Sequence, residues 1–325
     1  MCSPGGCPLP CRGLHALTQT TLEPGLVIAG HGRHVWVETP DGRRLICHPR
    51  GKKSQTVVGD HVLWQASQDE GTIEKVLPRR NLFYRQDEIR TKSFASNLDQ
   101  VLILIAAEPE FSEGQLSKAL IAAEAEHITP IIALNKSDLA VPFGRAWERL
   151  QAYQAMGYTV LSLALKPKVE GAHATELSAL LPLMENKTTL VLGPSGSGKS
   201  TFINRLVPKA QVLTNEISIA LQSGKHTTTS TTLYWIDDSK HSAVIDSPGF
   251  QEFGLNHIAP MQLAGLMPDI KAHAGDCKFY NCSHLHEPGC GVISSMKEAS
   301  STHGISASRY KIYSDLFADL SQKRF

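Results

Sequence analysis

The fold of this chain is decided by the stretch Gly193-Pro194-Ser195-Gly196-Ser197-Gly198-Lys199-Ser200-Thr201. It matches the pattern G-x-x-x-x-G-K-[ST], follows an apolar run at 189–192 and precedes a helix-like stretch at 202–206. Backbone N–H groups of such a loop converge at a helix N-terminus, where the helix dipole favours a bound phosphate. The stretch therefore predicts a phosphate-binding loop. We expect Lys199 to contact the β- and γ-phosphates as a catalytic group, and Ser200 to bind Mg²⁺.

A second motif, Asn135-Lys136-Ser137-Asp138, follows the apolar run at 130–134. In N-K-x-D the aspartate can accept hydrogen bonds from two N–H donors of guanine, a pair that adenine does not offer. A site built around such an acceptor rejects the wrong base by roughly 10⁴-fold. We expect Lys136 to pack over the base and Asn135 to tie the loop to its neighbours. Alone, the motif could be a polar helix cap, but beside a phosphate loop it predicts GTP or GDP as the ligand.

Asp246-Ser-Pro-Gly249 matches the pattern D-x-x-G directly after the predicted strand at 241–245. This position places the Asp246 carboxylate near Mg²⁺ and lets the Gly249 N–H contact the γ-phosphate. A polar stretch upstream contains Thr228 and Thr229, either of which could bind Mg²⁺ when the γ-phosphate is present. These residues therefore predict the nucleotide-sensing segments of a GTPase.

Phe250 occupies the position after D-x-x-G, where a water-orienting Gln is common. An apolar side chain cannot orient the attacking water, so another group must do so. His226, beside the two threonines, is our candidate catalytic residue. The alternative is a loop histidine without a catalytic part, and the sequence leaves both open.

The order of these motifs is unusual. The N-K-x-D motif comes first at 135, followed by the phosphate loop at 193, the threonines at 228 and D-x-x-G at 246. Ordinary regulatory GTPases keep the same cyclic order but begin with the phosphate loop. Because domain termini often lie close together, moving the start point preserves the fold. D-x-x-G then comes last in its domain, and we expect the nucleotide state to move whatever follows it.

A cysteine cluster marks the C-terminal region. Cys277, Cys282, His284 and Cys290 form a Cys₃His set, which is typical of structural Zn²⁺. A loop this short has little apolar core, so a bound ion would supply folding energy. His286 is an alternative to His284 as the fourth ligand.

The patterns divide the chain into four parts. Residues 1–21 are expected to be a flexible leader, and residues 22–95 contain five short predicted strands, typical of an oligonucleotide-binding (OB) β-barrel. A barrel with a purely structural or protein-docking role fits the pattern equally well. Residues 96–255 alternate apolar runs and amphipathic stretches, which predicts a doubly wound α/β domain. Residues 256–325 are expected to form the zinc-binding domain, closed by a helix at 306–323.

Within the α/β domain, the expected buried strands are at 101–106, 130–134, 158–163 and 189–192. The expected helices are at 114–125, 145–156 and 176–183, and a hairpin is expected at 231–236 and 241–245. Residues 79–92 combine cations with Phe83 and Tyr84, which suits either RNA contact or a solvated linker.

Composition restricts the function classes. Lys plus Arg total 32 and Asp plus Glu total 31, so a polybasic tail cannot be the main source of nucleic-acid affinity. The longest apolar run, at 101–107, is far shorter than the about 20 residues that a membrane span needs. The first residues lack the basic and apolar parts of a secretory signal. We therefore expect a cytoplasmic protein with no membrane partner, and nothing in the sequence demands more than a monomer.

The chain resembles the circularly permuted ribosome small subunit-dependent GTPase A family. The resemblance rests on the motifs above together with Val58-Gly-Asp60, Asn97-Leu-Asp-Gln100 and Lys225-His-Thr-Thr-Thr229. It implies an N-terminal OB barrel, a permuted GTPase domain and a C-terminal zinc domain. It also implies late maturation of the small ribosomal subunit, with ribosomal RNA as partner and with GTP hydrolysis stimulated by the subunit. Two features depart from the family pattern, namely the looser segment Ser162-Leu-Ala-Leu-Lys166 and Lys225, which replaces the usual Arg.

The sequence therefore predicts a Mg²⁺-dependent GTPase that acts on small subunits. The first alternative is an RNA-binding adaptor whose nucleotide site is occupied but nearly inactive. The second is a GTPase with a non-ribosomal target.

Overall fold

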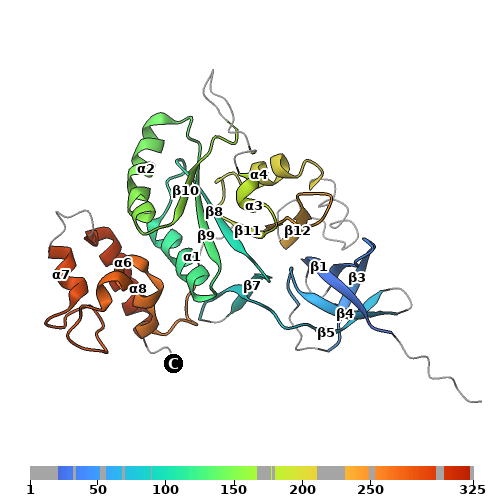
Figure 1. The fold of residues 1–325 in the computed structure, drawn as a ribbon, viewed down its shortest axis with the longest axis horizontal. Coiled ribbons are helices and arrows are strands. Elements are labelled where there is room, and N and C mark those ends of the chain that lie inside the picture. The colour runs from blue at the N-terminus through green and yellow to red at the C-terminus, as the bar shows by residue number, and fades with distance from the viewer. Residues whose placement is uncertain are drawn as a thin grey trace, which may run out of the picture.

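The computed structural model describes residues 21–31, 34–51, 56–67, 70–88, 90–166, 177, 180–210, 231–248, 253–297 and 304–322. The predicted sites at His226, Thr228, Thr229 and Gly249 lie outside these ranges, as does the predicted leader up to residue 20. The β-barrel and the C-terminal helices occupy opposite ends of the molecule, and a parallel sheet lies between them (Figure 1).

The N-terminal barrel has five strands: β1 (Glu23–His31), β2 (His34–Glu38), β3 (Arg44–Pro49), β4 (His61–Ala66) and β5 (Gly71–Val76). The strand order is β1-β2-β3-β5-β4, and β1 also pairs with β4, which closes the barrel. Gly42 has a φ of +86° in the β2–β3 turn, where the Gly42 N–H donates to the Thr39 carbonyl. Alternate apolar side chains such as Val35 and Val37 face the barrel interior. The predicted OB-type barrel is confirmed.

The central sheet continues from the barrel in the order β10-β9-β8-β11-β13-β12. Its strands are β8 (Gln100–Ala106), β9 (Thr129–Asn135), β10 (Thr159–Ser162), β11 (Thr188–Leu192), β12 (Thr231–Trp235) and β13 (Ala243–Asp246). All neighbours in this part are parallel except β12 and β13, which form the predicted antiparallel hairpin. The sequence therefore predicted both the parallel sheet and its added hairpin.

Helices cover both faces of this sheet. They are α1 (Glu113–Ala125), α2 (Ala140–Ala155), α3 (Leu181–Met184) and α4 (Lys199–Leu206). Ile103 of β8 belongs to the core shared with α1 and α2, whereas its neighbour Leu104 belongs to the core shared with α3 and α4. This alternation explains why β8 is buried along its whole length and reads as a continuous apolar run.

Two helices differ from their predicted bounds. α2 begins at Ala140 rather than at 145, and the predicted helix at 176–183 is reduced in the described residues to α3. The chain leaves α3 through Glu185 in an extended conformation and Asn186 at a φ of +54°, both of which end a helix.

Residues 82–96 form a hairpin outside the barrel. Its strands are β6 (Leu82–Gln86) and β7 (Thr91–Ser96), which pair as a separate two-stranded sheet. Phe83 is fully buried, with its ring centroid 5.9 Å from that of Phe94 and 5.7 Å from that of Phe253. Residues 79–92 were expected either to contact RNA or to form a solvated linker, and Phe83 is available for neither, because its side chain is buried in the hairpin packing.

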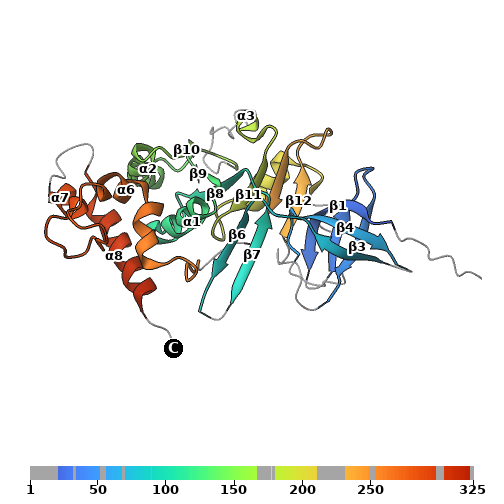
Figure 2. The same ribbon diagram turned by 60° about the horizontal axis from the view of Figure 1, so that its bottom comes forward.

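The C-terminal region is helical: η2 (Pro260–Leu266), α6 (Pro268–Ala274), α7 (Gly291–Lys297) and α8 (Ala307–Ser321). As a group these helices lie beside α1 and α2 in both views, with α7 on the outer side (Figures 1 and 2). The predicted final helix is confirmed, and the Ser306 side chain caps its N-terminus by accepting a hydrogen bond from the Arg309 N–H. Among the helices of the described ranges, none has the length and apolar character that a bilayer span requires.

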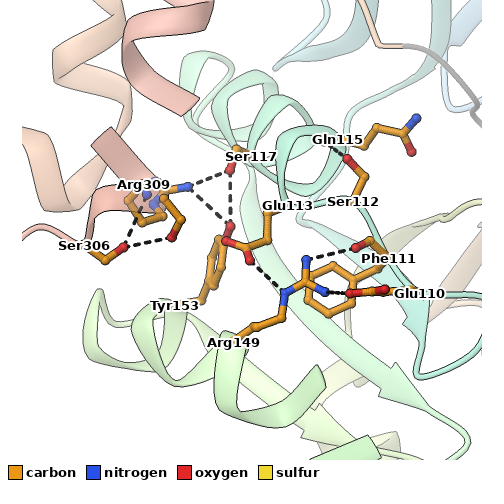
Figure 3. Close-up of polar contacts among 11 residues, drawn as sticks. Glu110, Phe111, Ser112, Glu113, Gln115, Ser117, Arg149, Tyr153, Ser306 and Arg309 are labelled. Carbon is orange, nitrogen blue, oxygen red and sulfur yellow. Dashed lines mark hydrogen bonds and ion pairs between the residues drawn. The ribbon is translucent and has the colours of Figure 1, made fainter. Parts of the chain in front are cut away.

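Arg309 attaches this region to the central sheet domain. Its side chain is 3% exposed and extends from α8 toward Ser117 on α1 and Tyr153 on α2 (Figure 3). Nη1 donates to the Ser117 hydroxyl at 2.6 Å, and Nε and Nη2 donate to the Asp269 carboxylate at 2.8 and 3.1 Å. The sequence gave no signal for this contact, because a single arginine on a helix usually faces solvent.

Candidate nucleotide and metal sites

The phosphate loop connects the end of β11 to the start of α4, the strand–loop–helix arrangement that its sequence predicts. Two glycines are required by its geometry. A Cβ on Gly193 would lie 2.1 Å from the Leu104 carbonyl oxygen, and Gly198 has a φ of +107° as the N-cap of α4. Because neither position tolerates a larger side chain, the loop backbone can pack tightly on β8 while its N–H groups converge at the helix N-terminus.

Lys199, the first residue of α4, folds back over this loop. Its Nζ donates to the carbonyl oxygens of Gly193 at 2.7 Å and Pro194 at 3.1 Å. Burial lowers the pKa of Lys199, and the nearby Asp246 carboxylate opposes that shift. The ammonium group is thus held at the loop by contacts that a phosphate oxygen could replace.

Asp246 ends β13 in the strand position next to Val191 of β11. Its side chain is buried, and burial raises its pKa to about 6 while the Lys199 charge acts in the opposite direction. Within the described ranges, Asp246 Oδ1 and the Ser197 hydroxyl have no hydrogen-bond partner although both are buried. Buried polar atoms are almost always partnered. This pair beside a phosphate loop therefore fits a polar ligand such as a nucleotide with its Mg²⁺.

Asn135 connects the N-K-x-D motif to the phosphate loop. Its Nδ2 donates to the Ser197 carbonyl oxygen at 2.9 Å, and its Oδ1 accepts from the N–H groups of Lys136 at 2.8 Å and Leu165 at 3.0 Å. Asn135 is 4% exposed, and its bonds to Ser197 and Leu165 are shielded from water. One amide therefore holds together three loops at the ends of the parallel strands, where ligands of open α/β sheets bind.

The segment at 163–165 forms the third loop. The Ser137 N–H donates to the Leu163 carbonyl at 2.9 Å, and Arg205 on α4 donates to the Leu165 carbonyl at 3.0 Å. Lys136 has a φ of +68°, and its ammonium donates to the Glu108 carbonyl. The looser sequence at 162–166 does not prevent this segment from reaching the N-K-x-D loop. Sequence reasoning missed its contacts because they are made by backbone atoms.

The predicted sites are therefore brought together only in part. The structure collects the phosphate loop, the N-K-x-D motif and Asp246 at one end of the sheet. The remaining predicted contributors to this site, His226, Thr228, Thr229 and Gly249, belong to segments outside the described residues.

The Cys₃His cluster is also assembled. The ligand atoms of Cys277, Cys282, His284 and Cys290 all lie within 4.8 Å of one another. The Cys277 and Cys290 sulfurs are 3.8 Å apart, and His284 Nδ1 lies 3.3 and 3.5 Å from them. Thiolates about 2.3 Å from a tetrahedral Zn²⁺ would be about 3.8 Å apart. The donor set therefore fits one Zn²⁺, with His284 rather than His286 as the fourth ligand.

Surrounding groups hold this cluster in place. The Glu287 carboxylate accepts from the Ser283 N–H at 2.7 Å and from its hydroxyl at 2.6 Å. Tyr313 on α8 donates its hydroxyl to the Ser283 carbonyl at 2.8 Å, and Tyr310 donates to the His284 carbonyl at 2.9 Å. The ligand loop is thereby fixed to α8. The sequence predicted the helix at 306–323 but gave no sign of these two hydrogen bonds.

Comparisons with known proteins identify the family. The model of the RsgA GTPase family matches residues 76–256. A protein of Variovorax paradoxus called small ribosomal subunit biogenesis GTPase RsgA is 68% identical over 325 residues, with all of both chains covered. A protein of the same name from Paraburkholderia xenovorans is 46% identical over 308 residues, covering 93% of this chain and 95% of that one.

Solved structures show the same arrangement. The crystal structure of YloQ, described as a circularly permuted GTPase, matches with a TM-score of 0.67 and 25% identity, covering 96% of this chain and all of that one. YjeQ from Thermotoga maritima matches with a TM-score of 0.68 and 27% identity, covering 94% of this chain and all of that one. The rotated order of motifs therefore reflects a circular permutation, and the chain belongs to the RsgA GTPase family of GTP hydrolases.

Proposed function

We propose that this GTPase acts in late maturation of the small ribosomal subunit, where it binds ribosomal RNA and hydrolyses GTP when the subunit stimulates it. The names of its relatives support the small subunit as its partner. The observation that carries the catalytic part is the buried, unpartnered Asp246 Oδ1 beside the phosphate loop, because it fits a Mg²⁺-bound nucleotide.

The nucleotide would lie across the end of the sheet that Asn135 holds together. Asp138 and Lys136 would recognise guanine, and Lys199 would exchange its loop carbonyls for phosphate oxygens. The full set of proposed nucleotide-binding residues is Asn135, Lys136, Ser137, Asp138, Gly193, Pro194, Ser195, Gly196, Ser197, Gly198, Lys199, Ser200, Thr201, Asp246 and Gly249. Loop N–H groups and the α4 dipole would stabilise the charge that develops on the phosphates.

Ser200 and Asp246 would bind Mg²⁺, together with Thr228 or Thr229. When bound, the ion neutralises charge on the β- and γ-phosphates. The residue after D-x-x-G is apolar, so we propose that His226 orients the attacking water. This assignment rests on sequence position.

The segment after D-x-x-G would carry the nucleotide state to the rest of the molecule. Phe253 stacks on Phe94, with the ring planes 6° apart, and Gln86 of β6 forms a bridge with Leu255. The chain that follows the proposed γ-phosphate contact is therefore packed on the β6–β7 hairpin before it enters the C-terminal helices.

We further propose a cytoplasmic monomer with one structural Zn²⁺ at the Cys₃His cluster. Its domains would be the leader at 1–21, a segment at 22–95 that contains the barrel (β1–β5) and the β6–β7 hairpin, the GTPase domain at 96–255 and the zinc-binding domain at 256–325. The barrel and the zinc-binding domain, at opposite ends of the molecule, would be the two RNA-binding parts (Figure 1).

The test is single-turnover GTP hydrolysis with and without purified small subunits. We expect strong stimulation by the subunit and its loss in Lys199→Ala, with Lys209→Ala as a lysine control outside the loop. GTP-dependent subunit binding without stimulated hydrolysis would instead identify an RNA-binding adaptor. Hydrolysis that small subunits stimulate and large subunits leave at the basal rate would establish the small subunit as the partner.

A further inference from the structure

The barrel and the central sheet share hydrogen-bonded strands. β1 of the barrel pairs antiparallel with β12, with Ala29 opposite Thr232 and Gly30 opposite Thr231. The two strands lie side by side in both views (Figures 1 and 2). The barrel is thus joined to the sheet edge by backbone hydrogen bonds rather than by a linker alone.

The same register leads to the nucleotide site. Thr232 lies opposite Asp246 of β13, and Asp246 lies beside Val191 of β11, two positions before the phosphate loop. One row across the sheet therefore runs from Ala29 in the barrel through Thr232 to Asp246 and Val191. A shift of β12 relative to β13 would move the backbone next to the proposed Mg²⁺ ligand.

A buried carboxylate fixes the other end of β12. Glu38 at the end of β2 has a side chain that is 4% exposed. Its Oε1 accepts from Trp235 Nε1 at 2.8 Å and from Lys240 Nζ at 2.7 Å, and its Oε2 accepts from Arg44 Nε at 2.7 Å. Trp235 ends β12 and Lys240 lies in the β12–β13 turn, so two of the three donors come from the central sheet.

These donors explain why the buried Glu38 carboxylate stays ionised. Burial alone would raise the pKa of Glu38, but the hydrogen bonds from Lys240, Arg44 and Trp235 outweigh it and hold the pKa below its ordinary value. A buried carboxylate with several charged donors has one well-defined geometry and is costly to separate from them. Glu38 is therefore a stiff connection between barrel and sheet.

We propose that Glu38 is a positioning residue that transmits binding of a small subunit on the barrel, through β12, to Asp246 and the phosphate loop. While the Glu38 carboxylate is bound both by the barrel and by the β12–β13 hairpin, β2 cannot move without moving the hairpin with it. The inference rests on the proposed function, because it requires that the subunit contacts the barrel and stimulates hydrolysis.

The test uses the full-length protein and two variants, Glu38→Gln and Trp235→Phe. The first removes the charge, and the second removes a single N–H while keeping an aromatic side chain. Glu74→Gln is the matched control, because Glu74 is also a barrel glutamate, and among the described residues its hydrogen-bond donors are Arg50 and Gln65 of the barrel. Basal hydrolysis, subunit affinity by co-sedimentation, and hydrolysis at saturating small subunits are measured for each.

We expect both variants to lose about tenfold in stimulation at saturating subunit, within the usual range of coupling between sites. Basal hydrolysis and subunit affinity should stay at wild-type values, as should every property of Glu74→Gln. The double variant should lose no more than Glu38→Gln alone, because both changes break the same contact. Should Glu38→Gln fail to fold, Trp235→Phe decides alone.

Full stimulation of both variants, alongside a stimulated wild type, would overturn the coupling role and leave the proposed function intact. Weaker subunit affinity with normal stimulation at saturation would also overturn it, because Glu38 would then shape only the docking surface. A wild type that small subunits do not stimulate would overturn the proposed function itself, and the coupling with it.

Discussion

Asn135 donates its side-chain N–H to the Ser197 carbonyl at 2.9 Å, which joins the N-K-x-D motif to the phosphate loop across 62 positions of sequence. The same side chain accepts a hydrogen bond from the Leu165 N–H, so it also holds the segment at 163–165 beside the proposed nucleotide site. Because an amide supplies a donor and an acceptor at fixed separation, no smaller side chain can make both contacts.

Asn135→Ala should therefore weaken GTP binding at least tenfold and lower the free energy of unfolding by about 2 kcal/mol, since buried backbone groups lose their partners. Asn81→Ala is the control, because Asn81 makes the same pair of bonds, both to Leu98, away from the proposed site. Nucleotide titration and urea unfolding distinguish the two effects. Equal losses of GTP affinity in both variants would show that Asn135 acts only through stability.

Asp246 predicts a pH dependence of the nucleotide-free protein. Burial raises its pKa to about 6 from an ordinary 3.8, so between these values the folded state holds a proton that the unfolded state has released. The folded state is thus favoured below this window and loses that advantage as the pH rises through 6. At pH 7.5 the buried charge costs the fold roughly 3 kcal/mol, because the pKa rises by slightly more than two units and each unit is worth about 1.4 kcal/mol.

Asp246→Asn should therefore stabilise the nucleotide-free protein at pH 7.5 by about this amount and leave it unchanged near pH 4, although it should abolish Mg²⁺-dependent GTP hydrolysis. Urea unfolding of variant and wild type across this range measures the difference. Asp237→Asn should have the opposite sign, because hydrogen bonds, the largest from Ser239, hold the pKa of Asp237 below its usual range. A destabilised Asp246→Asn at pH 7.5 would contradict a net cost of burying this carboxylate, which the nearby Lys199 charge offsets only in part.

Local sequence patterns predicted most of the fold. Apolar runs predicted β8 and β11, because a buried strand depends on residues that are neighbours in the sequence. The β6–β7 hairpin was not separated from the barrel, because its burial depends on Phe253, far along the chain. Arg309 and Glu38 were missed for the same reason, since a charged residue is buried only when distant partners bind it.

In the candidate sites, too, local spacing was predictable from the sequence, whereas contacts between distant residues were not. The Gly and Lys positions of the phosphate loop follow from a fixed spacing, and so do the zinc-ligand candidates. The sequence left open whether His284 or His286 is the fourth ligand, because both lie close to the cysteines in the chain. Only the three-dimensional structure shows which imidazole reaches the sulfur atoms. The contact of Asn135 with Leu165 uses a backbone N–H, which no residue type reveals.

The metal cluster predicts one tightly bound Zn²⁺ per chain. Burial raises the pKa of the Cys282 thiol above its ordinary value, so binding of Zn²⁺ at neutral pH must displace the thiol proton. Cys282→Ala should remove zinc binding and expose the α8 amides to hydrogen exchange, because the ligand loop is tied to α8 by Tyr310 and Tyr313. Cys47→Ala, at a buried thiol of the barrel, should keep full zinc content. Zinc retained by Cys282→Ala would exclude Cys282 as a ligand.

Arg309 predicts how firmly the C-terminal helices are attached to α1 and α2. Arg309→Met leaves the Asp269 carboxylate without its main partner and removes the donor to Ser117. Breaking a buried ion pair from one side usually costs about 3–5 kcal/mol, so this variant should unfold at clearly lower urea concentration. Lys311→Ala, on the same helix, breaks an exposed pair with Asp315 and should cost less than about 0.5 kcal/mol.

The double variant Arg309→Met with Asp269→Asn separates two explanations of that loss. If the cost comes from an unpaired buried carboxylate, replacing Asp269 as well should restore part of the stability, because no charge is left alone. If the cost comes from packing of the guanidinium against the Tyr153 ring, 5.1 Å from its centroid, the second change should restore nothing. Urea unfolding of the four proteins in the cycle decides between them. Since Arg309 contacts α1 and α2 rather than the nucleotide-binding loops, basal GTP hydrolysis should change little in any of the four.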